Sequence, residues 1–144
     1  MTSITNELPR QVIERAGSCC EYCLLSQDDN FFSFHIDHII SEKHGGVTES
    51  HNLSLSCPNC NTFKGSDIGS IDSQTGLLTP LFNPRLQQWV KHFHLDNGMI
   101  ELLTPEGRVT VFLLRLNQAD RVFERQELMS LGRYPCPTKG YFEA

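Results

Sequence analysis

Apolar and polar positions alternate in two short stretches of the first half of the chain, and this period of two predicts two β-strands, over 31–40 and 52–56. The glycine pair at 45–46 lies between them and is a turn signal. The residues after Cys60 are expected to form a short helix up to about Gly65. A strand, a turn, a strand and a helix within so few residues predict a compact ββα unit.

Helices are expected over most of the remaining chain. A first helix is predicted over 7–18, with Pro9 in its first turn and Gly17 as its C-terminal cap. Residues 65–84 are rich in Gly, Ser, Asp, Thr and Pro, which is typical of a loop or linker. Further helices are expected over 85–93, 109–116 and 118–131, with a tight turn at 96–98 and an irregular tail after Gly132.

These elements predict an α+β fold in two parts, a ββα module over residues 1–72 and a mostly helical C-terminal extension packed on it over 73–144. The apolar fraction of 39% is that of an ordinary globular protein. Neither a run of about 18 apolar residues nor the apolar region of a signal peptide is found, so we expect a cytoplasmic protein without a membrane partner.

Charge divides unevenly between the two parts. The net charge is −5; residues 1–72 hold 4 basic and 10 acidic side chains, whereas residues 73–144 hold 8 and 7. An acidic surface disfavours nucleic acid, because binding phosphates requires Lys and Arg. Any basic surface must therefore come from the second half. Its candidate phosphate contacts, which are equally well explained as a solvated helical surface, are Arg85, Lys91, Arg108, Arg115, Arg121 and Arg125.

Four of the six cysteines form two Cys-x-x-Cys pairs, Cys20 with Cys23 and Cys57 with Cys60. In a reducing compartment this spacing favours a tetrahedral zinc site over disulfides. Cys19 is an alternative ligand to Cys20, but only Cys20 keeps the two-residue spacer to Cys23. Cys136 is expected to be a spare thiol in the tail. A zinc ion at this site would be structural, because it closes a unit too small to bury much core.

Asp37 and His38 lie in the predicted strand between the two cysteine pairs, and Asn61 follows the second pair. Hydrolysis of a phosphodiester needs a base for the attacking water and a cation to stabilise the developing charge. Imidazole is a suitable base near neutral pH. A hard divalent cation prefers oxygen ligands, which Asp37 and the side-chain carbonyl of Asn61 can supply.

The sequence around these residues resembles the HNH endonuclease motif with its flanking zinc knuckles. The resemblance covers residues 20–65 and is carried by Phe34-His35-Ile36-Asp37-His38-Ile39-Ile40, His44-Gly45-Gly46, Asn52-Leu53 and Cys57-Pro58-Asn59-Cys60-Asn61-Thr62-Phe63-Lys64-Gly65. It implies a ββα-metal finger that cuts double-stranded DNA, with His38 as general base. Asp37 and Asn61 would bind catalytic Mg²⁺ or Mn²⁺, and Asn52 would hold the loop between the strands.

The chain departs from the family pattern at two positions. Asn61 replaces the last His, as in the HNN variant, and an amide oxygen is a weaker donor that suits Mg²⁺. Ser41 stands where many relatives carry proline. Additional candidate substrate contacts are Lys64, His35 and His44. The alternative function is a catalytically weak or inactive zinc-stabilised module that binds nucleic acid or protein.

Overall fold

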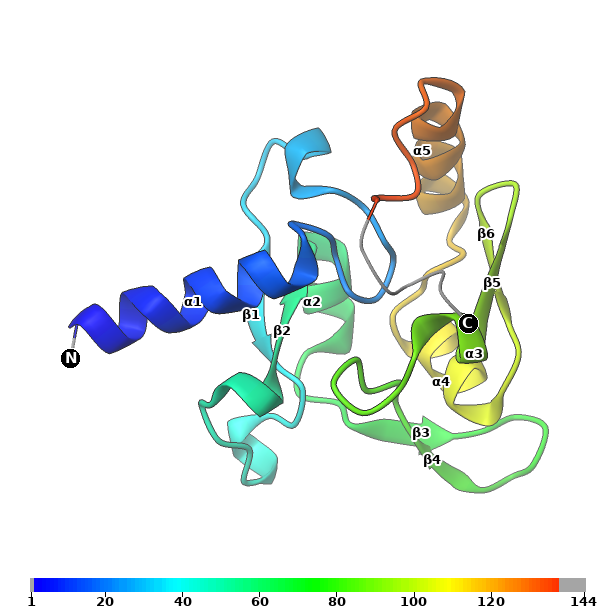
Figure 1. Cartoon of the computed structure of the whole chain (residues 1–144). Coiled ribbons are helices and arrows are strands. Elements are labelled where there is room, and N and C mark those ends of the chain that lie inside the picture. The colour runs from blue at the N-terminus through cyan, green and yellow to red at the C-terminus, as the bar shows by residue number, and fades with distance from the viewer. Residues whose placement is uncertain (1, 138–144) are drawn as a thin grey trace.

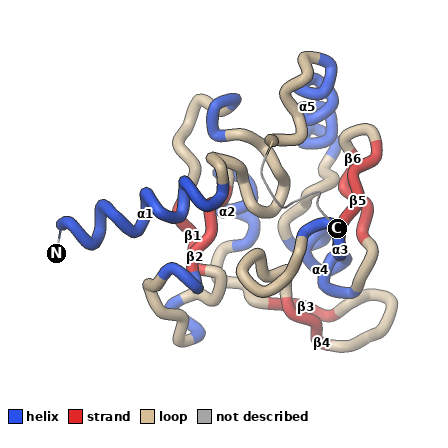
Figure 2. Tube along the Cα trace, viewed as in Figure 1, coloured by secondary structure: helices blue, strands red, loops and turns tan. Residues whose placement is uncertain are grey.

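Three separate two-stranded antiparallel sheets and five α-helices make up the computed structural model over its described residues, 2–137 (Figures 1 and 2). The helices are α1 (Thr2–Ala16), α2 (Pro58–Lys64), α3 (Trp89–His92), α4 (Pro105–Leu113) and α5 (Ala119–Ser130). The strands are β1 (His35–His38), β2 (Leu53–Ser56), β3 (Gly69–Ile71), β4 (Leu78–Pro80), β5 (Phe93–Asp96) and β6 (Met99–Leu102). The fold is α+β, as the sequence predicts.

The predicted ββα unit is formed by β1, β2 and α2. His38 pairs with Leu53 and His35 with Ser56 in the antiparallel ladder. The chain enters α2 directly after β2, because Cys57 is the N-cap residue and Pro58 occupies the first turn. The tight connection places α2 beside β1 (Figure 1).

Strand β1 is shorter than the predicted strand over 31–40. Its partner strand ends at Ser56, since the next residue, Cys57, begins the turn into α2. Residues before His35 therefore have no partner in the ladder. Phe31 and Phe32 are 97% and 70% exposed in the loop that precedes β1.

The segment 65–84, which the sequence predicts to be a loop, contains the hairpin β3–β4. Ser70 pairs with Thr79 in the short ladder. The hairpin is fastened to α4 by a buried carboxylate, because Asp72 accepts from Arg108 at 2.7 and 3.0 Å. This partner lies 36 residues away and keeps the pKa of Asp72 well below its usual range through the Arg108 hydrogen bonds.

The helix predicted over 85–93 is reduced to the single turn of α3. Asn83 starts one turn that does not continue into a helix: its side chain accepts from the backbone N–H of Arg85, and its carbonyl accepts from the N–H groups of Leu86 and Gln87. Gln88 is extended and restarts the helix. Leu86 is 82% exposed, and residue 93 belongs to β5.

The other helices follow the predicted pattern with shifted ends. Helix α4 begins earlier than expected because Thr104 caps it, accepting from Gly107 N at 3.1 Å, and α5 lies within 118–131. Helix α1 ends at Ala16, before the predicted residue 18, and starts before residue 7, so Pro9 lies inside the helix and not in its first turn. None of the described helices has the length and apolarity that crossing a membrane requires.

One apolar cluster joins the two halves of the chain. It contains Tyr22, Leu53 and Leu55 from the first half and Trp89 and Phe93 from the second. The contact is also polar: the indole N–H of Trp89 donates to the carbonyl of Tyr22 at 2.9 Å. The first Cys-x-x-Cys turn, which contains Tyr22, is therefore held in place by Trp89, more than 60 positions later in the chain.

Replacing Trp89 by Phe should lower the free energy of unfolding by about 1–3 kcal/mol. The change leaves the buried carbonyl of Tyr22 without its donor and creates a small cavity. Urea unfolding followed by circular dichroism measures the effect. The matched control is Phe123→Leu on the exposed face of α5, which should change stability little; equal effects of the two substitutions would contradict the role of Trp89.

Candidate active site and metal centre

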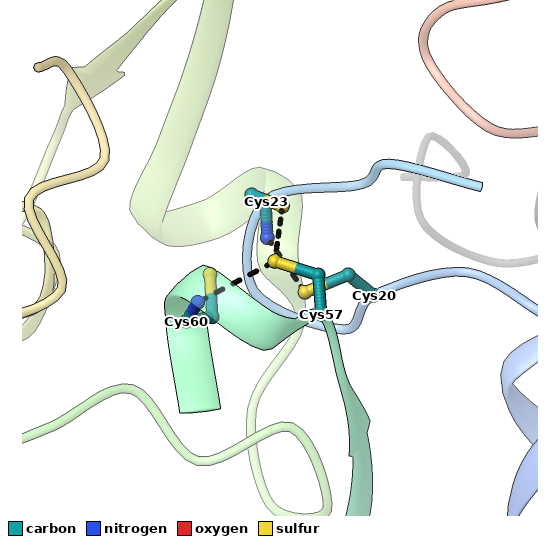
Figure 3. Close-up of side chains that lie close together, drawn as sticks. All are labelled: Cys20, Cys23, Cys57 and Cys60. Carbon is teal, nitrogen blue, oxygen red and sulfur yellow. Dashed lines mark hydrogen bonds between the residues drawn. The ribbon is translucent and has the colours of Figure 1, made fainter. Parts of the chain in front are cut away.

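The four predicted ligand cysteines come together in a buried cluster. The Sγ atoms of Cys20, Cys23, Cys57 and Cys60 all lie within 4.8 Å of one another, and those of Cys23 and Cys57 are 3.6 Å apart. Figure 3 shows that one pair comes from the loop after α1 and the other from the first turn of α2. Ligands about 2.3 Å from a tetrahedral zinc ion are separated by about 3.8 Å, so this cluster fits zinc.

Hydrogen-bond donors surround the sulfur atoms. The backbone N–H of Cys23 points to Cys20 Sγ at 3.5 Å and that of Cys60 to Cys57 Sγ at 3.4 Å. Arg121 of α5 donates to Cys60 Sγ at 3.1 Å and also contacts Cys57 Sγ at 3.8 Å. Burial lowers the pKa of Arg121, but the neighbouring thiolates outweigh it and raise the pKa above its usual value. These donors favour thiolates, the form that binds metal.

The prediction that Cys136 is a spare thiol is wrong. Cys136 forms a disulfide with Cys19, with their Cα atoms 5.9 Å apart. The tail is brought to Cys19 by two hydrogen bonds, from Cys136 N to Leu24 O at 3.0 Å and from the Tyr134 hydroxyl to Cys23 O at 2.7 Å. Cys19 is thus engaged elsewhere, and Cys20 is the residue whose sulfur joins the cluster.

A solvent-accessible cleft of about 350 Å³ lies between β1 and α2. It is lined by Asp37 and His38 of β1 and by Asn61 of α2, with His35, Ser41 and Glu42 among the other lining residues. His35 is exposed at the start of β1. Three of the predicted catalytic residues therefore face one cavity, although 24 positions separate Asp37 from Asn61.

Asp37 is buried and carries a charged partner. Its Oδ2 lies 2.9 Å from Nζ of Lys64, with which it forms an ion pair. Lys64 is 1% exposed and also donates to the carbonyl of His38 at 2.8 Å. Burial raises the pKa of Asp37, and the positive charge of Lys64 opposes part of this increase. The carboxylate thus sits where a nearby cation favours its charged form.

The ring of His38 is oriented by a residue that the sequence pattern does not reveal. Its Nε2 lies 2.8 Å from the hydroxyl of Thr48, in the loop between the two strands. The proton on Nε2 can be donated to Thr48, and this tautomer leaves the lone pair of Nδ1 available as a base. No sequence motif identifies Thr48 as a partner of His38, because the contact depends on the path that the loop takes in the folded chain.

Asn52 is buried and makes three hydrogen bonds that close this loop. Its side chain accepts from Ile40 N and donates to Ile40 O and Val47 O, each at 2.9 Å. A side chain added at Gly46 would meet the carbonyl oxygen of Ile40, at 1.7 Å from the Cβ position, so the close approach requires glycine there. This bonding fixes the loop that bears Thr48.

The remaining predicted contacts are placed differently. His44 is exposed at the end of a short 3₁₀ turn and is not among the residues that line the cleft. Four arginines of the second half make internal contacts: Arg85 pairs with the buried Glu21, Arg108 with Asp72, Arg121 with the cysteine cluster, and Arg125 with backbone carbonyls of Gly98 and Leu116. The guanidinium groups of these four arginines therefore stabilise the fold through internal contacts.

Comparison with known proteins supports the motif. Residues 20–67 match the family of HNH endonucleases. The chain is also 27% identical over 113 residues to the Septu protein PtuB of Bacillus thuringiensis, an alignment that covers 77% of this chain and 41% of that protein.

The chain thus spans less than half the length of this relative, and no solved structure gives a significant match. The alignment with PtuB is longer than the segment matched by the family, so the similarity extends beyond the cleft and the cysteine cluster. Residues 20–67, which contain both, match the HNH endonuclease family that their motif predicts.

Proposed function

We propose that this protein is a metal-dependent endonuclease that hydrolyses phosphodiester bonds of double-stranded DNA. The observation that carries the proposal is the common cleft of Asp37, His38 and Asn61, within the residues that match a nuclease family. A base and two oxygen donors in one solvent-accessible cavity are the groups that this hydrolysis requires.

His38 is the general base in this proposal. The Thr48 hydroxyl holds one ring nitrogen, so the other can accept the proton of the attacking water. Asn52 acts through the loop, since its hydrogen bonds to Ile40 and Val47 set the distance between Thr48 and β1. The arrangement keeps the imidazole in one orientation before substrate binds.

Asp37 and Asn61 hold the catalytic cation, Mg²⁺ or Mn²⁺. The donor set fits, because Asp37 offers carboxylate oxygens and Asn61 an amide oxygen in the same cleft. When bound, the cation stabilises the charge that develops on the phosphate and the leaving oxygen. Lys64 supplies positive charge to Asp37 from the buried side.

The cysteine cluster binds a structural zinc ion. Its sulfurs are buried and fill all four positions of a tetrahedron, so no position is left for a substrate. Its position at the start of α2 fixes the helix that carries Asn61.

A second candidate function is a zinc-stabilised module that binds nucleic acid or protein without cutting. The ion pair between Asp37 and Lys64 favours it, since the carboxylate already has a cationic partner. This alternative predicts zinc binding without nicking of DNA by any divalent cation.

Replacing His38 by Ala should reduce nicking of supercoiled plasmid by about 100-fold or more in Mg²⁺ or Mn²⁺, because the attacking water loses its base. Agarose gels measure the rate, and circular dichroism and zinc content should remain unchanged. His51→Ala is the matched control, since this exposed histidine lies outside the cleft. Nicking by His38→Ala at the parent rate would refute the assigned base, and an inactive parent protein would favour the second function.

Cys20→Ser should abolish stoichiometric zinc binding, whereas the neighbouring Cys19→Ser should retain one zinc ion per chain. The reason is that only Cys20 has its sulfur in the cluster. Zinc content measured by plasma mass spectrometry after gel filtration tests this. Equal zinc loss in the two variants, or a parent protein without zinc, would contradict the proposed site.

Lys64→Met should lower the free energy of unfolding by about 3–5 kcal/mol without a divalent cation, because Asp37 is left as an uncompensated buried charge. Added Mn²⁺ should then raise the unfolding midpoint more in this variant than in the parent, since the cation replaces the lost charge. Differential scanning fluorimetry measures both effects.

The double variant Asp37→Asn with Lys64→Met is the control for this experiment. It has no carboxylate to compensate, so its response to Mn²⁺ should disappear. A response of Lys64→Met no larger than that of the parent protein would show that no cation reaches Asp37.

A further inference from the structure

Only two cations of the second half have no hydrogen bond or ion pair through their side chains, within the described residues up to 137. Five arginines have such partners: Arg85, Arg108, Arg121 and Arg125 make the internal contacts described above, and Arg133 pairs with Asp29 at 2.6 Å. The two that remain are Lys91 and Arg115, and both are exposed.

Arg115 occupies a backbone position that normally belongs to glycine. It follows α4 with a φ of 50°, in the left-handed region, while Leu116 N donates to Val111 O at 3.1 Å. This bond is typical of a Schellman turn, in which the left-handed residue is usually glycine because a side chain there is strained. Arginine at this position therefore lowers the stability of the fold relative to glycine, because its side chain strains the left-handed backbone.

The guanidinium of Arg115 is held in a defined direction. Its central carbon lies 4.8 Å from the ring centroid of Phe63, on the helix α2 that also bears Asn61. Beside it is an open hollow of about 530 Å³, which Gln118 and Asn117 also line. Stacking on an aromatic ring orients the planar fork of an arginine while its N–H groups remain free to bind an anion.

We propose that Arg115 binds a backbone phosphate of the DNA that enters the cleft, at the position beside Phe63 of α2 where its guanidinium is stacked. This inference rests on the proposed nuclease function and adds one contact to it. A helix with its side chains is only about 10 Å wide, so a duplex at the cleft reaches past α2. The interaction is independent of sequence and positions the strand relative to His38.

A structural role for Arg115 is the competing explanation, since a cation at the C-terminus of α4 also complements the helix dipole. The two explanations differ for Arg115→Gly. Glycine relieves the backbone strain, so the thermal midpoint of this variant should not fall. A phosphate contact would nevertheless be lost.

The test measures binding of a fluorescein-labelled duplex by anisotropy at several KCl concentrations, in Mg²⁺. Every protein carries His38→Ala so that the duplex stays intact. Arg115→Gly should weaken binding at least about fivefold and make the salt slope less negative by about 0.9, the value for one phosphate contact. Arg115→Lys should keep the slope, and Lys91→Ala, the matched exposed control, should bind like the reference protein.

Unchanged affinity and slope in Arg115→Gly would overturn the inference and leave the proposed function in place. Weaker binding together with a lower thermal midpoint would also overturn it, in favour of a structural role. Failure of the reference protein itself to bind duplex would reject DNA as the substrate, and with it the phosphate contact.

Discussion

The close approach of two Cys-x-x-Cys turns is the constraint on which the rest of the structure depends. The turn at Cys20 and Cys23 follows α1, and the turn at Cys57 and Cys60 begins α2, so their contact closes the segment that contains both strands of the ββα unit and fixes the start of its helix. A unit of this size buries too little apolar surface to be stable alone. The sulfur cluster and the aromatic core around Trp89 supply what the small sheets lack.

In the candidate active site, the single side chain of Lys64 contacts two residues of β1. Lys64 is the last residue of α2 and reaches both the carboxylate of Asp37 and the carbonyl of His38. One ammonium group therefore ties α2 to β1 and balances the charge of the proposed metal ligand. Stability and chemistry are coupled here, because a change at Lys64 alters both the strand position and the field at Asp37.

Residue spacing predicts the ββα unit and its cysteine cluster because each rests on local signals: period-two alternation, a turn, a helix cap and paired thiols. The hairpin β3–β4 escapes prediction since its strands have only three residues each and are stabilised by Arg108, far along the chain. Asn83 caps a single turn through the N–H of Arg85, but the helix does not continue, because the backbone of Gln88 is extended. Local preference does not decide such competitions.

Side-chain roles are predictable only where a motif fixes them. The alternation that places Asp37 and His38 on a strand does not identify Thr48, whose hydroxyl meets His38 because Asn52 shapes the loop. The sequence also does not show whether an arginine is exposed or buried: Arg115 is exposed, whereas Arg125 is fully buried. Which arginines are enclosed depends on where distant carbonyls and thiolates lie in the folded chain.

The contact of Arg121 with the cysteine sulfurs makes the C-terminal half an electrostatic component of the proposed zinc site. Four thiolates around a divalent cation keep a double negative charge, and the guanidinium cancels half of it inside the protein. An excised segment of residues 20–67 would expose that charge to water and lose its counterion. The family motif is therefore shorter than the smallest electrically balanced unit of this protein.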